Sequence, residues 1–253
     1  MKIGLNLFSI RNLIQTETDF LETAQTLKAN GCSYLQYSGA PYNPEMLQRV
    51  SAQTGLPIVL THVPMDRIIG DTEALMKEHA LFNCKNIGLG SMPDAIIKDE
   101  IACKETIEKL NAAAKKMQDN GFKFFYHHHH FEFLKYGGQT IFDYIIQNAP
   151  FINFTLDTYW LQYGGADIIE KIKQLKGRVE CVHLKDYQMT FSDEKFQPAF
   201  APLGDGVLDF KKIVQAMQES GVKYFLIEQD NAALLPDSIQ PILKSLAYAT
   251  TAL

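Results

Sequence analysis

The sequence predicts an α/β protein that folds as a single (β/α)8 barrel, also called a TIM barrel, across residues 1–253. Short apolar segments alternate with longer amphipathic segments along the whole chain, which is the pattern of βα units on a parallel sheet. Eight apolar segments can be counted, and a helical pattern follows each of them. One barrel of this type commonly takes about 250 residues, so the length requires no second domain.

The first half of the chain supplies four of the predicted strands. They are KIGLNLF (2–8), SYLQY (33–37), PIVLTHV (57–63) and NIGLG (86–90). Helices are predicted across DFLETAQTLKANG (19–31), NPEMLQRVSAQTG (43–55) and the longer stretch 97–119. The first two of these helical segments end in glycine, which suits the left-handed residue that closes many helices.

The second half completes the count. Strands are predicted at FKFFYHHH (122–129), INFTLD (152–157), VECVHL (179–184) and YFLIEQ (224–229), with helices near 139–147, 165–175, 209–220 and 236–250. The longest irregular segment is expected at 187–206, and long loops in compact domains often act as lids. A doubly wound open sheet is the main competitor, but the first βα turn, FSIRN, lacks the GxGxxG phosphate fingerprint.

Composition and charge argue against several classes of protein. Hydrophobic residues make up 46% of the chain and charged residues 21%, which is typical of a globular protein with a large core. The formal charge of −5, with dispersed lysines and arginines, argues against a nucleic-acid partner. No apolar run approaches the ~20 residues of a membrane span, so we expect no membrane partner and a cytoplasmic location, although a chain trimmed of a signal peptide would read the same. The four widely spaced cysteines are predicted to be buried thiols: Cys32, Cys84, Cys103 and Cys181.

Ionisable residues stand at the ends of five predicted strands, where the reacting groups of a (β/α)8 barrel lie. Asp157, His183 and Glu228 each follow an apolar strand, and burying such a group is costly unless it is paired, protonated or bound to metal. His62 and the run YHHHHFEF (126–133) end two more strands. Carboxylates with imidazoles and no thiolate favour an open catalytic site for Mn²⁺, Zn²⁺, Co²⁺ or Fe²⁺, with Mg²⁺ if few imidazoles bind. A polar, metal-free pocket is the alternative.

The histidine run raises a question of direction. Side chains alternate along a strand, so His127 and His129 share one face while His128 and His130 share the other. If Phe125 faces the helix layer, His128 points into the barrel; a bulge would turn His127 and His129 inward instead. The segment FKFFY is apolar on both faces, which leaves this choice open. His130 is expected to face solvent or to bond to a loop.

Six segments follow one another along the chain: IGLNLFSIRN, YHHHHFEF, FTLDTYW, GRVECVHLKD, APLGDGVLDF and YFLIEQD. In this order they resemble the sugar phosphate isomerase/epimerase family with the xylose isomerase-like barrel. One branch of that family has a strand ending in HNHxxEF, then LDxYW, GRxxxxHxKD, a GxG turn before a helix, and a closing (V/I)EQD. The resemblance covers nearly the whole chain and is specific for the superfamily but not for a substrate.

The resemblance implies one divalent metal ion, most often Mn²⁺, held by residues from strands five to eight. Carried over by motif, the ligands from the last three strands are Asp157, His183 and Glu228. Many epimerases carry a glutamate earlier on this strand, where the present sequence has HxHxxEF. Glu132 is therefore expected as the strand-five ligand, with His127 or His129 as rivals. His128 replaces the asparagine of the HNH pattern, and Gln36 stands where many relatives have an acid.

The chemistry that the resemblance implies begins with removal of a proton from a carbon beside a carbonyl group. A metal that holds the carbonyl and hydroxyl oxygens stabilises the resulting enediolate. Glu132 and Glu228 are expected to exchange the proton as base and acid. Lys185 either neutralises a developing oxyanion or pairs with Asp186. The remaining expected substrate contacts are His62, His127, His129 and an apolar wall of Trp160 with Tyr159 and Phe8.

The leading prediction is therefore a divalent-metal-dependent sugar isomerase or epimerase that acts on a small unphosphorylated carbohydrate, since no phosphate-binding signature is evident. A lyase, dehydratase or keto-glycoside-cleaving enzyme shares the first step and is the alternative. An abasic-site endonuclease-like phosphodiesterase is less favoured, because phosphate contacts normally need clustered Lys or Arg. A non-catalytic sugar-binding barrel is the remaining hypothesis. The particular sugar and the oligomeric state cannot be predicted from these motifs.

Overall fold

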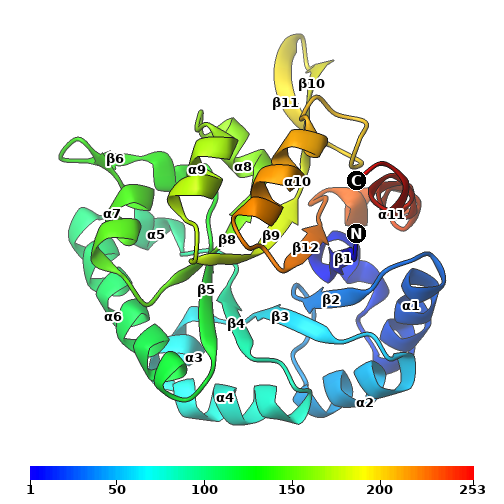
Figure 1. Ribbon diagram of the computed structural model, residues 1–253, viewed down its shortest axis with the longest axis horizontal. Helices are drawn as coiled ribbons and strands as arrows, with labels where there is room; N and C mark the ends of the chain where they lie inside the picture. Colours follow the sequence, from blue (N-terminus) through cyan, green and yellow to red (C-terminus); the bar gives the residue numbers. More distant parts are fainter.

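A closed barrel of eight parallel strands surrounded by helices forms the body of the molecule (Figure 1), which confirms the predicted (β/α)8 fold. The computed structural model describes residues 1–253. Neighbouring strands run in the order β1 (Gly4–Asn6), β12 (Tyr224–Ile227), β9 (Val179–Leu184), β8 (Asn153–Asp157), β5 (Lys123–His127), β4 (Asn86–Leu89), β3 (Ile58–His62) and β2 (Tyr34–Tyr37), and β2 closes the ring on β1.

The helices follow the strands as the sequence predicts, with ends shifted by a few residues. The longer ones are α1 (Glu17–Ala29), α2 (Pro44–Thr54), α4 (Thr72–Leu81), α6 (Glu100–Asp119), α7 (Ile141–Asn148), α9 (Ile168–Gln174), α10 (Phe210–Glu219) and α11 (Gln240–Ala252). Several begin at a capping side chain: Thr16, Asn43 and Asp99 each accept a hydrogen bond from a backbone N–H in the first turn. None of the helices is both long and apolar enough to cross a membrane.

Shorter elements lie in the loops that follow the strands. They are η1 (Leu7–Leu13), α3 (Met65–Gly70), α5 (Asp94–Ile97), η2 (Phe131–Phe133), the strand pair β6 (Lys135–Tyr136) and β7 (Gln139–Thr140), α8 (Thr158–Tyr163) and η3 (Ala232–Leu234). Among these, α8 follows β8 directly and was not predicted as a separate helix. It carries Tyr159 and Trp160 to the end of the barrel at which the strands finish.

The barrel interior is layered, with apolar side chains below polar ones. A large core cluster fills the space between strands and helices, and a second cluster of six residues includes the inward-facing side chains of the strands. Strand alternation links that second cluster to the polar layer, because each of its inward members stands two positions before an inward polar residue. These members are Tyr34, Leu60, Phe125, Cys181 and Leu226, which precede Gln36, His62, His127, His183 and Glu228.

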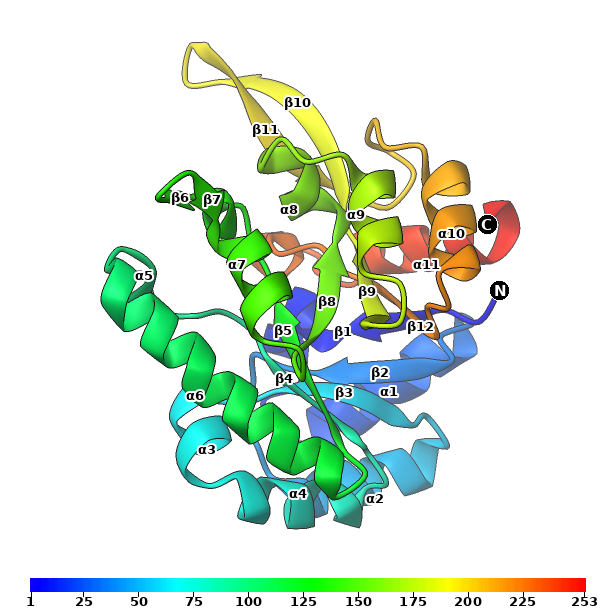
Figure 2. The ribbon, with the colours of Figure 1, turned by 60° about the vertical axis from the view of Figure 1, so that its left-hand side comes forward.

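The segment 187–206, predicted to be irregular, is mostly a β-hairpin, so that prediction was wrong. Strands β10 (Asp186–Ser192) and β11 (Lys195–Ala201) pair in antiparallel fashion and stand away from the barrel in both views (Figures 1 and 2). We call this hairpin the arm. Its two turn residues, Asp193 and Glu194, have φ of 51° and 60°, the left-handed conformation of the tight turns that suit the twist of a hairpin.

The base of the arm is closed by one carboxylate. Asp186 Oδ2 accepts hydrogen bonds from the backbone N–H groups of Gly204 and Gly206, both at 2.9 Å, and Asp186 Oδ1 accepts one from Tyr187 at 2.8 Å. A Cβ on Gly206 would lie 2.3 Å from Asp186 Oδ1, so only glycine fits there. The GDG turn at 204–206 therefore returns the chain from the arm to the barrel.

Candidate active site

The polar ends of the barrel strands converge on one cavity of about 330 Å³. This end of the barrel is the one at which the reacting groups of (β/α)8 enzymes are found. Only one of the lining residues, Phe8, is hydrophobic. The ionisable residues in the lining are His62, His127, His129, Lys185, Glu228 and Asp230.

The histidine run does not have the orientation in which His128 points into the barrel. Phe125 and His127 face the barrel interior, and β5 pairs with β4 and β8 without a register shift, so no bulge is needed. His129 also lines the cavity. His128 lies on the other face, where its ring meets Phe142 of α7 edge-on with centroids 5.1 Å apart. Of the two orientations left open by the sequence, the structure has the one with His127 and His129 toward the cavity, and it is reached without a bulge.

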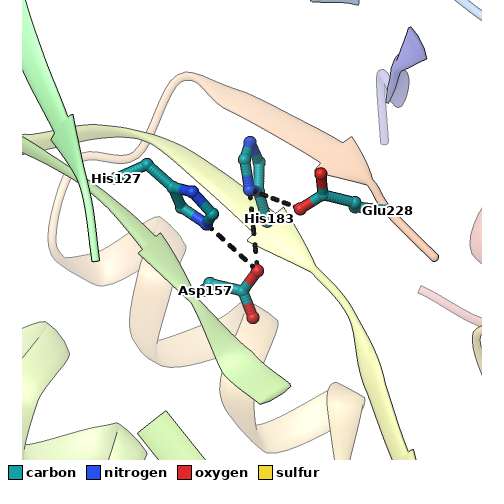
Figure 3. A group of neighbouring side chains, drawn as sticks. All are labelled: His127, Asp157, His183 and Glu228. Atoms are coloured by element: carbon teal, nitrogen blue, oxygen red, sulfur yellow. Dashed lines mark hydrogen bonds and ion pairs between the residues drawn. The ribbon is translucent and has the colours of Figure 1, made fainter. Parts of the chain in front are cut away.

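Four buried side chains bring their donor atoms within 4.8 Å of one another: His127, Asp157, His183 and Glu228 (Figure 3). His183 Nδ1 lies 2.8 Å from Glu228 Oε2 and 3.6 Å from Asp157 Oδ2. His127 Nε2 lies 3.3 Å from the same Asp157 oxygen. Each residue comes from the end of a different strand, β5, β8, β9 and β12, so the barrel itself sets their spacing. We call these four residues the central group.

In both imidazoles of the central group, the nitrogen that points away from the carboxylates donates a hydrogen bond to an oxygen. His127 Nδ1 lies 2.9 Å from the carbonyl oxygen of Gly90, which can only accept, so this nitrogen carries the hydrogen. His183 Nε2 lies 2.8 Å from Gln36 Oε1 in the same way. In the neutral rings, His127 Nε2 and His183 Nδ1 therefore direct lone pairs at carboxylate oxygens. Such an arrangement requires a cation between them, either a proton or a metal ion.

Lys185 lies against the central group and is 1% exposed. Its Nζ is 2.8 Å from Asp157 Oδ2, 2.9 Å from Glu228 Oε2 and 2.9 Å from Asp230 Oδ1. Burial by itself lowers the pKa of Lys185, but the three carboxylates raise it well above its usual value, so the side chain is a cation. The predicted pair with Asp186 does not form, because Asp186 is turned toward the base of the arm.

The carboxylates control the charge of the central group. Burial alone would lower the pKa of His183, but Glu228 and Asp157 raise it to about 9, so a proton binds tightly where the lone pair points. Burial tends to raise the pKa of both carboxylates, and the cations around them hold it below its usual range. His62 and His129 have pKa values well below normal, first because they are buried and then because other histidines lie close. These two rings are neutral.

Comparison with known proteins places the chain in a family. The family model described as "Xylose isomerase-like TIM barrel" matches residues 22–249. The chain belongs to this family. A curated relative, inosose dehydratase from Clostridium perfringens, is 27% identical over 120 residues, which is 43% of this chain and 40% of the relative. The matched part thus spans about two fifths of the relative's length.

Solved structures of the xylose isomerase-like fold superpose on nearly the whole chain. A sugar phosphate isomerase/epimerase from Parabacteroides distasonis does so with a TM-score of 0.82 at 20% identity, covering 99% of this chain and 94% of the other. A xylose isomerase-like TIM barrel protein from Mycobacterium smegmatis, crystallised in complex with magnesium, gives 0.71 at 14% identity, covering 98% and 94%. At these identities the likeness establishes the fold.

Within this xylose isomerase-like barrel, Glu132 is not part of the central group. It lies in η2, after β5, and is buried behind the strand, where Tyr126 donates its hydroxyl hydrogen to Glu132 Oε1 at 2.6 Å. The backbone N–H of His129 donates to Glu132 Oε2 at 2.7 Å. Tyr126 faces the helix layer, so Glu132 is drawn to the outside of the barrel wall. His127, named as a rival ligand, occupies the strand-five place instead.

Of the other predicted substrate residues, Phe8, His62, His129 and Lys185 line the cavity, whereas Tyr159 and Trp160 do not. His62 stacks on His127 with ring centroids 5.4 Å apart, and the ring of Trp160 lies 5.2 Å from that of His129. Lys185 Nζ is 5.2 Å from the Trp160 ring. His130, expected to face solvent or to bond to a loop, is half-buried, and its ring stacks on that of Trp160 with centroids 5.1 Å apart.

Polar residues that support the site were not all predicted as part of it. Asn6 donates to Glu228 Oε1 at 2.6 Å, and Ser38 in turn donates to Asn6 Oδ1 at 2.6 Å. Gln36 orients His183, so its amide takes a structural role where relatives were expected to have an acid. Asp230 was visible only as the last residue of the EQD motif. Each of them ends or follows a strand, which is the one signal that could have identified them.

Proposed function

We propose that the protein is a divalent-metal-dependent isomerase or epimerase that removes a proton beside the carbonyl group of a small, unphosphorylated carbohydrate. The observation that carries this proposal is the central group, in which two imidazole lone pairs and two carboxylates meet in a buried place. The membership of the xylose isomerase-like family supports it. Isomerases and lyases of this kind share proton abstraction as the first step and differ in the fate of the enediolate.

The central group fits a divalent cation. Its donor atoms lie within 4.8 Å of one another, a span that suits one ion with ligands at about 2.1 Å. His183 Nδ1 and Glu228 Oε2 are buried and lack a hydrogen bond of acceptable geometry, although they lie close together. Mixed nitrogen and oxygen donors without thiolate suit Mn²⁺, and also Zn²⁺, Co²⁺ or Mg²⁺. The residues that would hold the ion are His127, Asp157, His183 and Glu228.

Charge balance supports the same ion. With both imidazoles neutral, three carboxylates (Asp157, Glu228 and Asp230) and one ammonium group (Lys185) leave a formal charge of −2, which one divalent cation neutralises. When bound, such an ion polarises a substrate carbonyl and stabilises the negative oxygen formed on proton loss.

The side chains that face the cavity have distinct roles in this proposal. Glu228 lines the cavity while Asp157 is fully buried, so Glu228 is the central carboxylate that a substrate carbon can approach and the proposed proton acceptor. Asn6 fixes its other oxygen. Lys185 places a cation where negative charge develops on a substrate oxygen. His62 and His129, being neutral, are suited to hydrogen bonds with sugar hydroxyls.

The cavity electrostatics favour an unphosphorylated substrate. Lys185 is the one lysine or arginine in the cavity lining, and its ammonium group already contacts three carboxylates. Glu228 and Asp230 add negative charge to the same lining. Because Lys185 and the proposed divalent ion already balance the carboxylates, the lining has no further lysine or arginine to bind a phosphate group.

A lyase or dehydratase is the second candidate, and the position of Glu132 favours it. Exchange of a proton between two faces of the substrate was expected to use Glu132 and Glu228, but Glu132 is held outside the barrel wall. An elimination needs only one carboxylate, such as Glu228, to remove the proton while a β-substituent departs with the bond electrons, so it does not require Glu132. The curated relatives named inosose dehydratase support this alternative.

Metal analysis combined with deuterium exchange tests the proposal. Purified wild-type protein is compared with D157A/H183A and with a control, H130A, which changes a histidine of the same run outside the central group. We expect about one divalent ion per chain in wild type and H130A, and none in the double variant. Incubation of sugars and keto-sugars in D2O should give deuterium beside a carbonyl with the metal-containing proteins only. Metal content no higher than in the double variant would refute the metal site, and a deuterated isomer or a dehydrated product would distinguish the two reactions.

A further inference from the structure

The arm is amphipathic, with its two faces sharply divided. The paired residues Tyr187 and Phe200, Met189 and Pro198, and Phe191 and Phe196 alternate with the pairs Gln188 and Ala199, Thr190 and Gln197, and Ser192 and Lys195. Side chains of directly paired residues lie on the same side of a sheet. One face of the arm is therefore composed only of apolar and aromatic side chains, whereas the other is mainly polar.

Only the inner end of this apolar face is covered by the protein. Phe200 and Tyr187 pack on Tyr159 of α8, with ring centroids 4.4 Å and 5.2 Å away. The outer residues have no such support: Met189 is 54% exposed, Phe191 63% and Phe196 77%. Figure 2 shows this outer half standing clear of the barrel.

The exposed part of this face is comparable in size to the largest apolar patch of a typical single chain. Taking ~200 Å² for a fully exposed side chain of this size, the three outer residues expose roughly 400 Å² of mainly apolar surface. Patches of about this size on monomers often mark a binding surface. A two-stranded hairpin is also only marginally stable in water by itself, so its outer half gains most from being covered.

We propose that the arm is a dimerisation element, in which its apolar face packs on the same face of a second copy of this chain. A two-fold interface needs just one self-complementary patch, and a face that is apolar along its whole length meets that need. With the two arms antiparallel, each acidic tip (Asp193 and Glu194) lies away from that of the other copy, which avoids repulsion. The polar face stays in solvent.

The area of the patch places the proposed dimer among weak complexes. Two copies would cover roughly 800 Å² through the arms alone, which is below the 1,200–2,000 Å² of stable complexes and in the range of weak ones. The dimer should therefore be concentration-dependent, with dissociation in the micromolar range. This inference does not depend on the reaction that the protein catalyses.

Sedimentation velocity of the full chain between about 1 and 100 μM tests the proposal. Wild type should shift with concentration toward a mass twice the 28.6 kDa of the chain. F191S/F196S should raise the dimer dissociation constant at least tenfold. The matched control T190S/Q197S changes the neighbouring cross-strand pair on the polar face and should behave like wild type. M189K leaves the Phe191–Phe196 pair intact but places like charges on the apolar face, so it should raise the dimer dissociation constant as well.

Three outcomes would overturn the inference. Wild type that sediments as a monomer at every concentration would show that the arm does not pair. Dimerisation of F191S/F196S or M189K with the wild-type constant would place the interface elsewhere. A loss of dimerisation in T190S/Q197S equal to that in F191S/F196S would show that the hairpin conformation, not its apolar face, governs association. Thermal melting of each variant checks that the barrel remains folded.

Discussion

Replacing Lys185 by methionine is expected to destabilise the protein severely. Methionine has a similar length and volume, so the change removes the charge and leaves packing nearly intact. The three carboxylates around Lys185 Nζ would then face one another in a buried site without their cation. Removing one partner of a buried ion pair costs far more than removing an exposed one, because the remaining charge stays desolvated.

The contact distances give the magnitude. At 2.8–2.9 Å and an effective dielectric constant near 20, each contact contributes roughly 6 kcal/mol of gross Coulomb energy. Desolvation of the ammonium group offsets several kcal/mol per ion, and proton uptake by the carboxylates relieves part of the remainder. We therefore expect K185M to lower the free energy of unfolding by about 3–5 kcal/mol at pH 7.5.

Urea unfolding, followed by circular dichroism in the presence of a chelator, measures this loss without a metal ion to replace the lysine charge. The control is K171M. Lys171 pairs with Asp143 at 2.8 Å near the surface, so its loss should cost no more than about 1 kcal/mol. A K185M effect as small as that of K171M would refute the view that Lys185 balances the charge of the central group.

Two further changes test other parts of the structure. Burial raises the pKa of Glu132 to about 7 against 4.5 for an unburied glutamate, so its contribution to stability is complete below pH 4.5 and is lost as pH rises through 7. Between pH 5 and pH 8, the free energy of unfolding of wild type, measured with urea, should thus fall by up to about 3 kcal/mol relative to that of E132Q. Parallel pH profiles for the two proteins would contradict this. In G88A the new Cβ would meet the Thr61 carbonyl oxygen at 2.7 Å, so its melting temperature should fall by an amount equivalent to about 1–3 kcal/mol. G70A, whose Cβ meets no atom within 4 Å, should be neutral or slightly stabilised, and equal melting temperatures for the two variants would refute the packing argument.

The barrel could be predicted because local and global signals agree in this chain. Each strand is a short apolar run, each helix has an amphipathic pattern, and eight such units have one closed arrangement. The arm was missed, although its strands alternate apolar and polar residues, because the turn is Asp193-Glu194. Neither residue is the glycine or asparagine that usually marks such a turn.

The site was predictable by position but not by direction. Asp157, His183 and Glu228 each stand at the end of an apolar strand, and the closed barrel brings all three together. Alternation could not identify the strand-five residue, because β5 is buried on both faces and the pattern does not say which face is the interior. Glu132 shows the same limit, since its direction depends on Tyr126 and the backbone of His129 rather than on spacing.

The carboxylate of Asp186 also affects how freely this fold can diversify. This carboxylate accepts hydrogen bonds from the backbone at both ends of the arm, so it holds these ends together whatever residues lie between them. The arm could then lengthen, shorten or be exchanged between related chains while β9 and the central group keep their positions. The proposed metal site and the proposed dimer contact would thus vary independently of each other, because Asp186 and the GDG turn connect the arm to the barrel.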